Sequence, residues 1–163
     1  MIKLKTIAVI RFADNELAYI VKRFDRRHGQ KIGQEDFCQL SNRSEETAGR
    51  NYKYDSSYEE VGRILKQHCK AYPVEIEKLF MRILFNYVFS NGDAHLKNFS
   101  LFRSDFGDYV LTPAYDLLCT SLHFPTESRT ALTMFDTFET ESFRQNDFCK
   151  RPDFVKLAER YGI

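Results

Sequence analysis

Residues 91–98 read Asn-Gly-Asp-Ala-His-Leu-Lys-Asn, and a further acid, Asp116, follows after a short alternating segment. Phosphoryl transfer needs a carboxylate that orients the attacking hydroxyl or accepts its proton, and oxygen ligands that hold Mg²⁺ against the nucleotide phosphates. Asp93 suits the first role, and Asn98 and Asp116 suit the second. The spacing from Asp93 to Asn98 equals that of the protein-kinase catalytic loop. The pattern therefore indicates a kinase-like site.

The segment that follows this loop must carry the last acid back to it. Residues 99–102 and 109–112 are short β-rich runs around a glycine-containing turn, which is typical of a hairpin. At about 3.3 Å per strand residue, the first strand moves Asp105 roughly 13 to 17 Å away from Asn98, and the returning strand covers the same distance backwards. We therefore expect Asp116 beside Asn98. Asp105 is expected to be a turn residue, although it opens the Asp-Phe-Gly tripeptide that binds metal in kinases.

A helix is expected to lead into the loop. Residues 73–89 begin with proline, carry glutamates in the first turn and place apolar residues at helical spacing. This helix should end near Gly92 and deliver Asp93 at its carboxyl end, which gives the site a rigid support. Residues 57–69 show the same helical spacing.

The remaining elements are shorter. Residues 6–11 and 16–24 are β-rich and predict a hairpin. The basic, glycine-containing segment 25–33 reads as an exposed loop, residues 35–40 as the start of a helix, and residues 43–53 as a loop.

Three blocks of sequence together resemble the HipA family of bacterial toxin serine/threonine kinases. The first is Asn-Gly-Asp-Ala-His-Leu-Lys-Asn-Phe-Ser-Leu-Phe, followed by Leu-Thr-Pro-Ala-Tyr-Asp-Leu-Leu; the others are residues 17–26 with 34–40, and Lys-Tyr-Asp-Ser-Ser-Tyr at 53–58. They occur in the family's order, from about residue 5 to about residue 122. A more distant similarity extends to phosphoinositide kinases, which also carry an Asp-x-His-x-x-Asn loop.

The resemblance implies an α+β, protein-kinase-like fold. Residues 1–24 would be a remnant of the small-lobe hairpin and the hinge, and residues 25–163 a mostly helical lower lobe with a catalytic-loop hairpin. ATP and Mg²⁺ would be the cofactors. Asp93 would be the catalytic base, and Asn98 and Asp116 the metal ligands.

The resemblance also implies a nucleotide site. Backbone groups of the hinge would meet the adenine edge, and Phe24 would pack on or near the ring. An acidic residue is common in the family where this sequence has Lys22, but a backbone contact does not depend on that side chain. The residues implied are Lys22, Arg23, Phe24, His95, Leu96, Lys97, Asn98, Tyr115 and Asp116.

Two parts of a complete kinase have no counterpart in this sequence. No glycine precedes Gly29, and the lysines upstream of Phe24 are Lys3, Lys5 and Lys22, so neither the glycine-rich phosphate loop nor its lysine can be assigned. The carboxyl end also stops short of the family's usual helical tail. We therefore expect the middle of a HipA-like kinase, truncated at both ends.

The sequence is compatible with three functions. The chain could be an ATP- and Mg²⁺-dependent kinase that acts on serine or threonine hydroxyls of a protein substrate, with an antitoxin or a separate small-lobe chain as a partner. It could instead be a catalytically inactive binding module. A third reading is a metal-dependent phosphohydrolase built on Asp93, His95 and Asp116.

Several individual residues also allow a role other than nucleotide or metal binding. His95 could be a core histidine, Lys97 a solvated lysine or a neutraliser of phosphate charge, and Asn98 a cap of the hairpin. The arginines of the basic loop are expected to be solvated or to touch a substrate protein; they are Arg23, Arg26 and Arg27.

Composition agrees with a single domain that is large enough to bury a core. The 163 residues carry a net charge of +1, which gives no electrostatic case for direct nucleic-acid binding. The four cysteines include no Cys-x-x-Cys pair, so neither a zinc site nor a disulfide framework is indicated, and a reduced, cytoplasmic setting fits best. No signal peptide or membrane-spanning apolar run is apparent.

Overall fold

The computed structural model describes residues 7–163. The predicted first strand residue, Thr6, and the upstream lysines Lys3 and Lys5 lie outside the described residues. The elements, with η for 3-10 helices, are β1 (Ile7–Arg11), β2 (Leu17–Val21), β3 (Arg26–Arg27), β4 (Gln30–Lys31), β5 (Gln34–Asp36), α1 (Phe37–Leu40), α2 (Glu45–Ala48), α3 (Tyr58–His68), α4 (Tyr72–Val88), η1 (Leu96–Asn98), β6 (Ser100–Arg103), β7 (Tyr109–Leu111), η2 (Thr120–Leu122), α5 (Glu141–Asn146) and α6 (Arg151–Tyr161).

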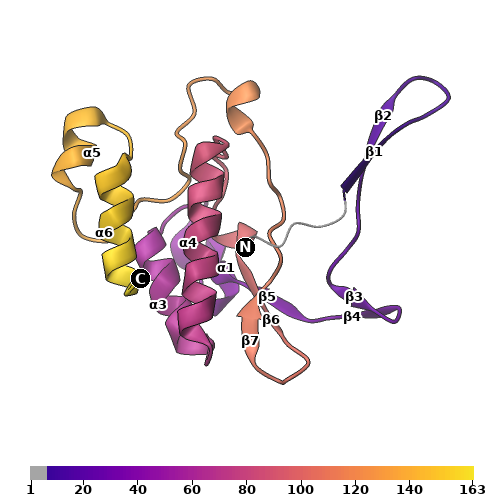
Figure 1. Cartoon of the computed structure of the whole chain (residues 1–163), viewed down its shortest axis with the longest axis horizontal. Helices are drawn as coiled ribbons and strands as arrows, with labels where there is room; N and C mark the ends of the chain where they lie inside the picture. The colour runs from indigo at the N-terminus through magenta and orange to yellow at the C-terminus, as the bar shows by residue number, and fades with distance from the viewer. Residues whose placement is uncertain (1–6) are drawn as a thin grey trace.

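Within residues 7–163 the strands form three separate antiparallel sheets. β1 pairs with β2, β3 pairs with β4, and the third sheet has the order β5-β6-β7. In Figure 1 the β1–β2 hairpin extends away from the body of the molecule, whereas β5, β6 and β7 lie against the helices. The fold is α+β, as the sequence predicts.

The two helices predicted at 57–69 and 73–89 and the β6–β7 hairpin are confirmed. α4 begins next to its proline, and α3 begins at Ser57, whose side chain accepts a hydrogen bond from the backbone of Glu60. β6 and β7 form the predicted hairpin, with Leu101 opposite Leu111.

Three segments that were predicted from weaker patterns differ in detail. The region predicted as a helix start is first a strand, because Glu35 pairs with Leu101 of β6; the helix begins only after Asp36, whose carboxylate caps it together with Gln39. The predicted loop at 25–33 contains the short β3–β4 ladder, and the loop at 43–53 contains α2, which is capped by Ser44. These ladders and turns are too short to leave a periodic signal.

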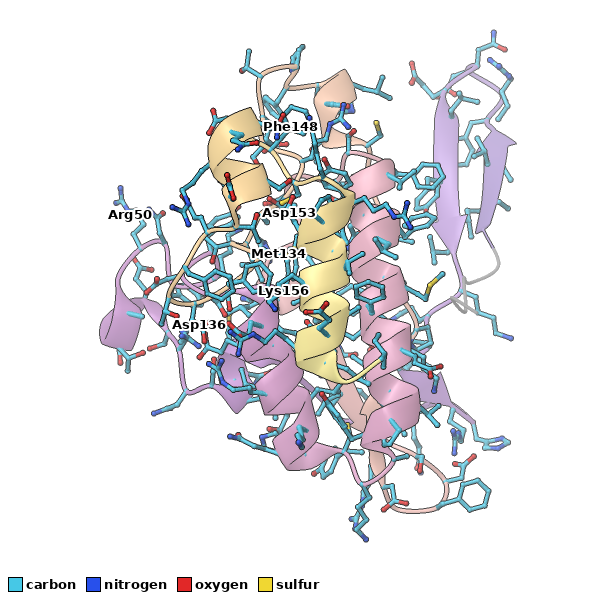
Figure 2. The ribbon with its side chains drawn as sticks, turned by 60° about the vertical axis from the view of Figure 1, so that its left-hand side comes forward. Arg50, Met134, Asp136, Phe148, Asp153 and Lys156 are labelled. Atoms are coloured by element: carbon cyan, nitrogen blue, oxygen red, sulfur yellow. The ribbon has the colours of Figure 1, made fainter. Side chains whose placement is uncertain are left out.

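The core lies between α3, α4, α6 and the β5-β6-β7 sheet. Gly62 lets α3 and α6 approach closely, because a Cβ atom there would lie 2.3 Å from the ring of Tyr161. Figure 2 shows α6, which carries the labelled Asp153 and Lys156, running beside α4. The fully buried large side chains include Phe37, Tyr58, Leu65, Ile76, Leu79, Ile83, Leu96, Phe99, Leu101 and Leu157.

Two charged side chains of α4 fix the strand that leads towards the site. Glu75 accepts a hydrogen bond from the backbone of Leu111 at 2.9 Å, and Arg82 donates one to the carbonyl of Thr112 at 2.5 Å. Both side chains are buried, and burial lowers the pKa of Arg82 to about 10. α4 thereby holds the end of β7, from which the chain runs to Asp116. None of the helices within residues 7–163 has the length and apolar character that a bilayer span requires.

Candidate active site

The structure places Asp116 beside Asn98, as the length of the hairpin predicts. Nδ2 of Asn98 donates a hydrogen bond to Oδ2 of Asp116 at 2.5 Å. Oδ1 of Asn98 accepts a hydrogen bond from the backbone of His95 at 3.0 Å, which fixes the orientation of the amide. Asp116 has a φ of 55°, and Nδ2 of Asn91 donates to its carbonyl at 3.2 Å. The acid is therefore held on both its side chain and its backbone.

Asp105 lies in the turn between β6 and β7. The backbone of Ser104 donates to the carbonyl of Asp108 across this turn, and the carboxylate of Asp105 forms an ion pair with Arg27. The Asp-Phe-Gly tripeptide therefore occupies a hairpin tip, as expected from its distance along the strand.

Asp93 follows α4 and lies within hydrogen-bonding distance of a second segment of chain. Its carboxylate is 39% exposed, and its Oδ1 atom accepts a hydrogen bond from the hydroxyl of Tyr54 at 2.5 Å. Nε2 of His95 lies 3.9 Å from the same oxygen. An exposed carboxylate with one oxygen already held is suited to orienting a hydroxyl.

Gly92, at the start of the loop, is packed tightly against a neighbouring segment of chain. A Cβ atom at this position would lie 2.1 Å from the carbonyl oxygen of Ser128 and 2.8 Å from Oε2 of Glu127. The backbone of Gly92 also donates to the hydroxyl of Thr120 at 2.9 Å. The segment from η2 to Ser128 therefore packs directly on the loop, and only glycine fits there.

His95 is buried, and its ring packs edge-on against the ring of Tyr54 with 5.1 Å between the centroids. Its Nδ1 atom has no hydrogen-bond partner within residues 7–163. Burial lowers the pKa of His95, and the positive charge of Lys53 lowers it further. Burial therefore favours the neutral imidazole, which lies against the ring of Tyr54 and near the carboxylate of Asp93.

A cavity of about 730 Å³ lies between residues 19–25 and the segment that carries Asp116. Two of its lining residues, Phe24 and Tyr115, stack their rings, with centroids 5.7 Å apart and planes at 29°. The hydroxyl of Tyr115 donates to the carbonyl of Lys97 at 2.7 Å, and burial raises its pKa to about 12. The lining residues are Tyr19, Val21, Lys22, Arg23, Phe24, Asp25, Gln34, Ala114, Tyr115, Asp116, Leu117 and Leu118.

The other residues implied for the nucleotide site do not line this cavity. The side chain of Leu96 is fully buried in the core, so it could meet a ligand only through its backbone. His95 and Asn98 are also buried, whereas Lys97 is exposed and its ammonium lies 6.0 Å from the ring of Tyr52.

Arg23 and Arg26 are engaged in ion pairs with Asp25 rather than simply solvated. Arg23 makes a bidentate contact with Asp25 at 2.8 and 2.5 Å, and Arg26 adds a third contact at 2.7 Å. The hydrogen bonds from Arg23 are the main cause that lowers the pKa of Asp25 to about 2. These contacts brace the turn that follows Phe24.

The donor set beside the cavity is compatible with Mg²⁺. Residues 7–163 contain no group of three or more His, Cys, Asp or Glu side chains that could hold a metal ion. A Mg²⁺ ion that is bound with a nucleotide takes few protein ligands, because phosphate oxygens and waters complete its octahedron. Asp116 supplies a carboxylate, and the oxygen of Asn98 has a second lone pair beyond the one that His95 uses. The pair therefore fits such an ion, although it would not form a site alone.

Sequence reasoning missed the contacts of two residues at this site. Tyr54 entered only as part of a resembling block, and its contact with Asp93 spans 39 residues that no local pattern connects. Asn91 is buried and bonds both Asn86 and Asp116. The signal that could have found it is the pair of polar residues Arg82 and Asn86 on the apolar face of α4.

The chain matches the HipA-like C-terminal domain over residues 2–162. It belongs to the HipA family. A Sinorhizobium fredii protein, Y4dM, is 30% identical over 147 residues, which cover 90% of this chain and 34% of that protein. A Haemophilus influenzae protein is 30% identical over 109 residues, which cover 65% of this chain and 32% of that protein. The names of both relatives describe them provisionally as kinases, and this chain spans about a third of their length.

The fold has a counterpart among solved structures. The HipA structure of Shewanella oneidensis MR-1, solved as a toxin–antitoxin complex with HipB and operator DNA, has a TM-score of 0.66 and 22% identity. The match covers 97% of this chain and 42% of that one. The kinase-like fold of the HipA family thus extends over nearly all of the 163 residues.

Proposed function

We propose that this HipA-family chain carries the catalytic loop and the lower part of the nucleotide site of an ATP- and Mg²⁺-dependent serine/threonine protein kinase. The observation that carries the proposal is the contact between Asn98 and Asp116. Nδ2 of Asn98, which precedes the hairpin, lies 2.5 Å from Oδ2 of Asp116, which follows it. This contact brings the two proposed metal ligands together, with Asp116 lining the cavity and the carboxylate of Asp93 on the same loop as Asn98.

Each part of the site has a defined task in this proposal. Mg²⁺, when bound, supplies charge that neutralises the phosphates during transfer. Asn98 and Asp116 hold that ion, and Asp93 orients the acceptor hydroxyl and receives its proton. Phe24, stacked on Tyr115, offers an aromatic surface for the adenine.

The glycine-rich loop and the lysine that pair with the phosphates in kinases have no counterpart in the 163 residues. In this proposal another polypeptide segment supplies them and also covers the β1–β2 hairpin. An antitoxin is a second candidate partner, because the HipA of Shewanella oneidensis was solved with HipB. The net charge of +1 gives this chain no electrostatic basis for holding nucleic acid itself.

Transfer of radiolabelled phosphate from ATP, to the chain itself or to a cytoplasmic protein extract, tests the proposal. We expect Asp93→Asn to lower the rate by about 10² to 10⁴, which is the usual contribution of a positioned base. Asp105→Asn is the matched control, because it removes a carboxylate from the tip of the adjoining hairpin. Loss of transfer in Asp105→Asn with retention in Asp93→Asn would show that the site is wrongly assigned.

The absence of a phosphate loop from the sequence favours a second candidate, a catalytically inactive HipA-like binding module. Phosphate transfer distinguishes the two candidates. The module binds Mg-ATP or a partner protein but transfers no phosphate under any condition, including after addition of a small-lobe chain.

A further inference from the structure

Tyr54 and Asp93 are joined by a hydrogen bond although 39 residues separate them. The phenol oxygen lies 2.5 Å from Oδ1 of the carboxylate. We propose that Tyr54 is a positioning residue, which holds the carboxylate of Asp93 in the orientation that receives an acceptor hydroxyl. The inference rests on the role of Asp93 proposed above and adds a second segment of chain to the site.

The turn that carries Tyr54 and the loop that carries Asp93 form one unit. The backbone of Leu96, in the loop, donates a hydrogen bond to the carbonyl of Lys53 at 3.0 Å. Tyr54 is further fixed by its own backbone, which donates to Asn51 at 2.8 Å. This backbone hydrogen bond holds the turn that carries Tyr54 against the loop that carries Asp93. A lid that swings over the base would need a segment that is free of the loop.

The ring of Tyr54 is held on two sides. It meets the ring of His95 edge-on, and the ammonium of Lys53 lies 4.8 Å from its centroid. These contacts need the aromatic ring but not the hydroxyl. Phenylalanine at this position therefore keeps the packing and removes only the hydrogen bond to Asp93.

The two oxygens of Asp93 have different surroundings. Oδ1 is taken by Tyr54, with Nε2 of His95 at 3.9 Å, whereas Oδ2 accepts no hydrogen bond from residues 7–163. The carboxylate is 39% exposed. The tyrosine thus fixes one oxygen and leaves the other for the acceptor hydroxyl, whose proton Asp93 would receive.

Tyr54 remains a donor throughout the physiological range. Partial burial, the hydrogen bond to Asp93 and the negative charges of Asp93 and Glu127 raise the pKa of its phenol to about 12. Lys53 and neutral His95 are the other ionisable groups against the ring. The hydroxyl therefore keeps its proton while Asp93 works as a base.

Steady-state kinetics of phosphate transfer separate positioning from simple structural support. Tyr54→Phe should lower kcat by about 10-fold to 100-fold, as is usual when a catalytic group is slightly misplaced. KM for Mg-ATP should stay the same, because Tyr54 does not line the 730 Å³ cavity. Tyr109→Phe is the matched control, because the side chain of Tyr109 is exposed, and it should leave both constants unchanged. A parental kcat in Tyr54→Phe would refute the proposal, and a higher one would mean that the phenol blocks the acceptor.

A second measurement tests the contact without relying on activity. In chain labelled at the tyrosine Cζ atom, the Tyr54 resonance is identified by its loss in Tyr54→Phe. Asp93→Asn should lower the pKa of the phenol below about 12, although burial still keeps it above its ordinary value, whereas Asp105→Asn should not change it. An unchanged pKa in Asp93→Asn would overturn the inference. A lowered pKa in a chain that transfers no phosphate would leave the contact standing and count against the proposed function instead.

Discussion

Asn98 and Asp116 lie within hydrogen-bonding distance, 2.5 Å between Nδ2 and Oδ2, although 18 residues and a complete hairpin separate them in the chain. The hairpin makes this possible because its two strands have nearly the same length and return the chain to the point where it left the loop. Arg82 and Asn91 then hold the returning segment, through the carbonyls of Thr112 and Asp116.

This relationship predicts that Mg-ATP binding depends on Asp116. We expect Asp116→Ala to weaken binding by about 1.5 to 3 kcal/mol, or roughly 10-fold to 100-fold, since it removes a charged ligand. Calorimetric titration with and without Mg²⁺ measures the effect, which should disappear when Mg²⁺ is omitted. Asp105→Ala is the control and should bind as the parent does. Equal affinity of Asp116→Ala and the parent for Mg-ATP would refute the assignment of the metal ligand.

The parts of the fold that follow from periodicity were predictable from the sequence. α4, α3 and the β6–β7 hairpin each carry a repeated apolar pattern, and strand length alone placed Asp116 near Asn98. The edge strand β5 was not predictable, because Gln34, Glu35 and Asp36 carry no strand pattern and pair only because β6 is adjacent. The tertiary contact with β6 therefore determines the extended conformation of this segment.

The site was predictable where its residues fall within one motif or are joined by a hairpin whose length the sequence indicates. Asp93, His95 and Asn98 fall within one motif, whereas Tyr54 reaches Asp93 through packing of a distant turn. The engagement of Arg23 by Asp25 was also missed, since basic residues in a loop were read as solvated. Side-chain pairing of this kind leaves no periodic trace in a single sequence.

Gly92→Ala should destabilise the chain by about 1 to 3 kcal/mol, because its Cβ atom would meet the backbone carbonyl of Ser128, which cannot turn away as a side chain does. Urea unfolding at neutral pH measures the change. Gly33→Ala is the matched control: no atom lies within 4 Å of its Cβ position, so we expect no loss, or a gain of about 0.4 to 1 kcal/mol. Equal stability of the two variants would contradict the close packing on the loop.

The ion pairs of Asp25 should give stability that depends on pH. Its pKa is lowered to about 2 in the folded chain, from an ordinary value of 3.8, chiefly by hydrogen bonds from Arg23. A lowered folded-state pKa stabilises the fold above pH 3.8, and the contribution is lost as the pH falls through about 2. Because the arginines are half exposed, we expect about 1 kcal/mol or less.

Comparison of Asp25→Asn with the parent tests this dependence. The variant should be less stable in urea at pH 5 to 7, and the difference should shrink as the pH falls towards 2. A difference that grows towards acid would show that Asp25 is not stabilised as its carboxylate.

The β1–β2 hairpin should make the isolated chain associate. Val9 pairs with Tyr19 across the two strands, and Leu17 lies on the same face; these side chains are 63%, 65% and 61% exposed. A two-stranded hairpin is marginal alone, and its open edges can pair with another chain. An apolar face of this kind in a soluble monomer usually marks a contact surface. We expect masses above 19.2 kDa by light scattering at micromolar concentration, together with binding of a dye that reports apolar surface.

The double variant Val9→Thr with Tyr19→Thr tests whether this face is responsible. Threonine keeps the preference for strand structure while it removes most of the apolar area, so the hairpin should persist and the association should weaken. Tyr109→Thr removes an exposed aromatic residue from β7 and should leave the association unchanged. Association that persists in the double variant would place the contact elsewhere. A monomeric parent with little dye binding would show that the hairpin needs no covering segment, and it would weaken the proposal that another polypeptide completes the nucleotide site.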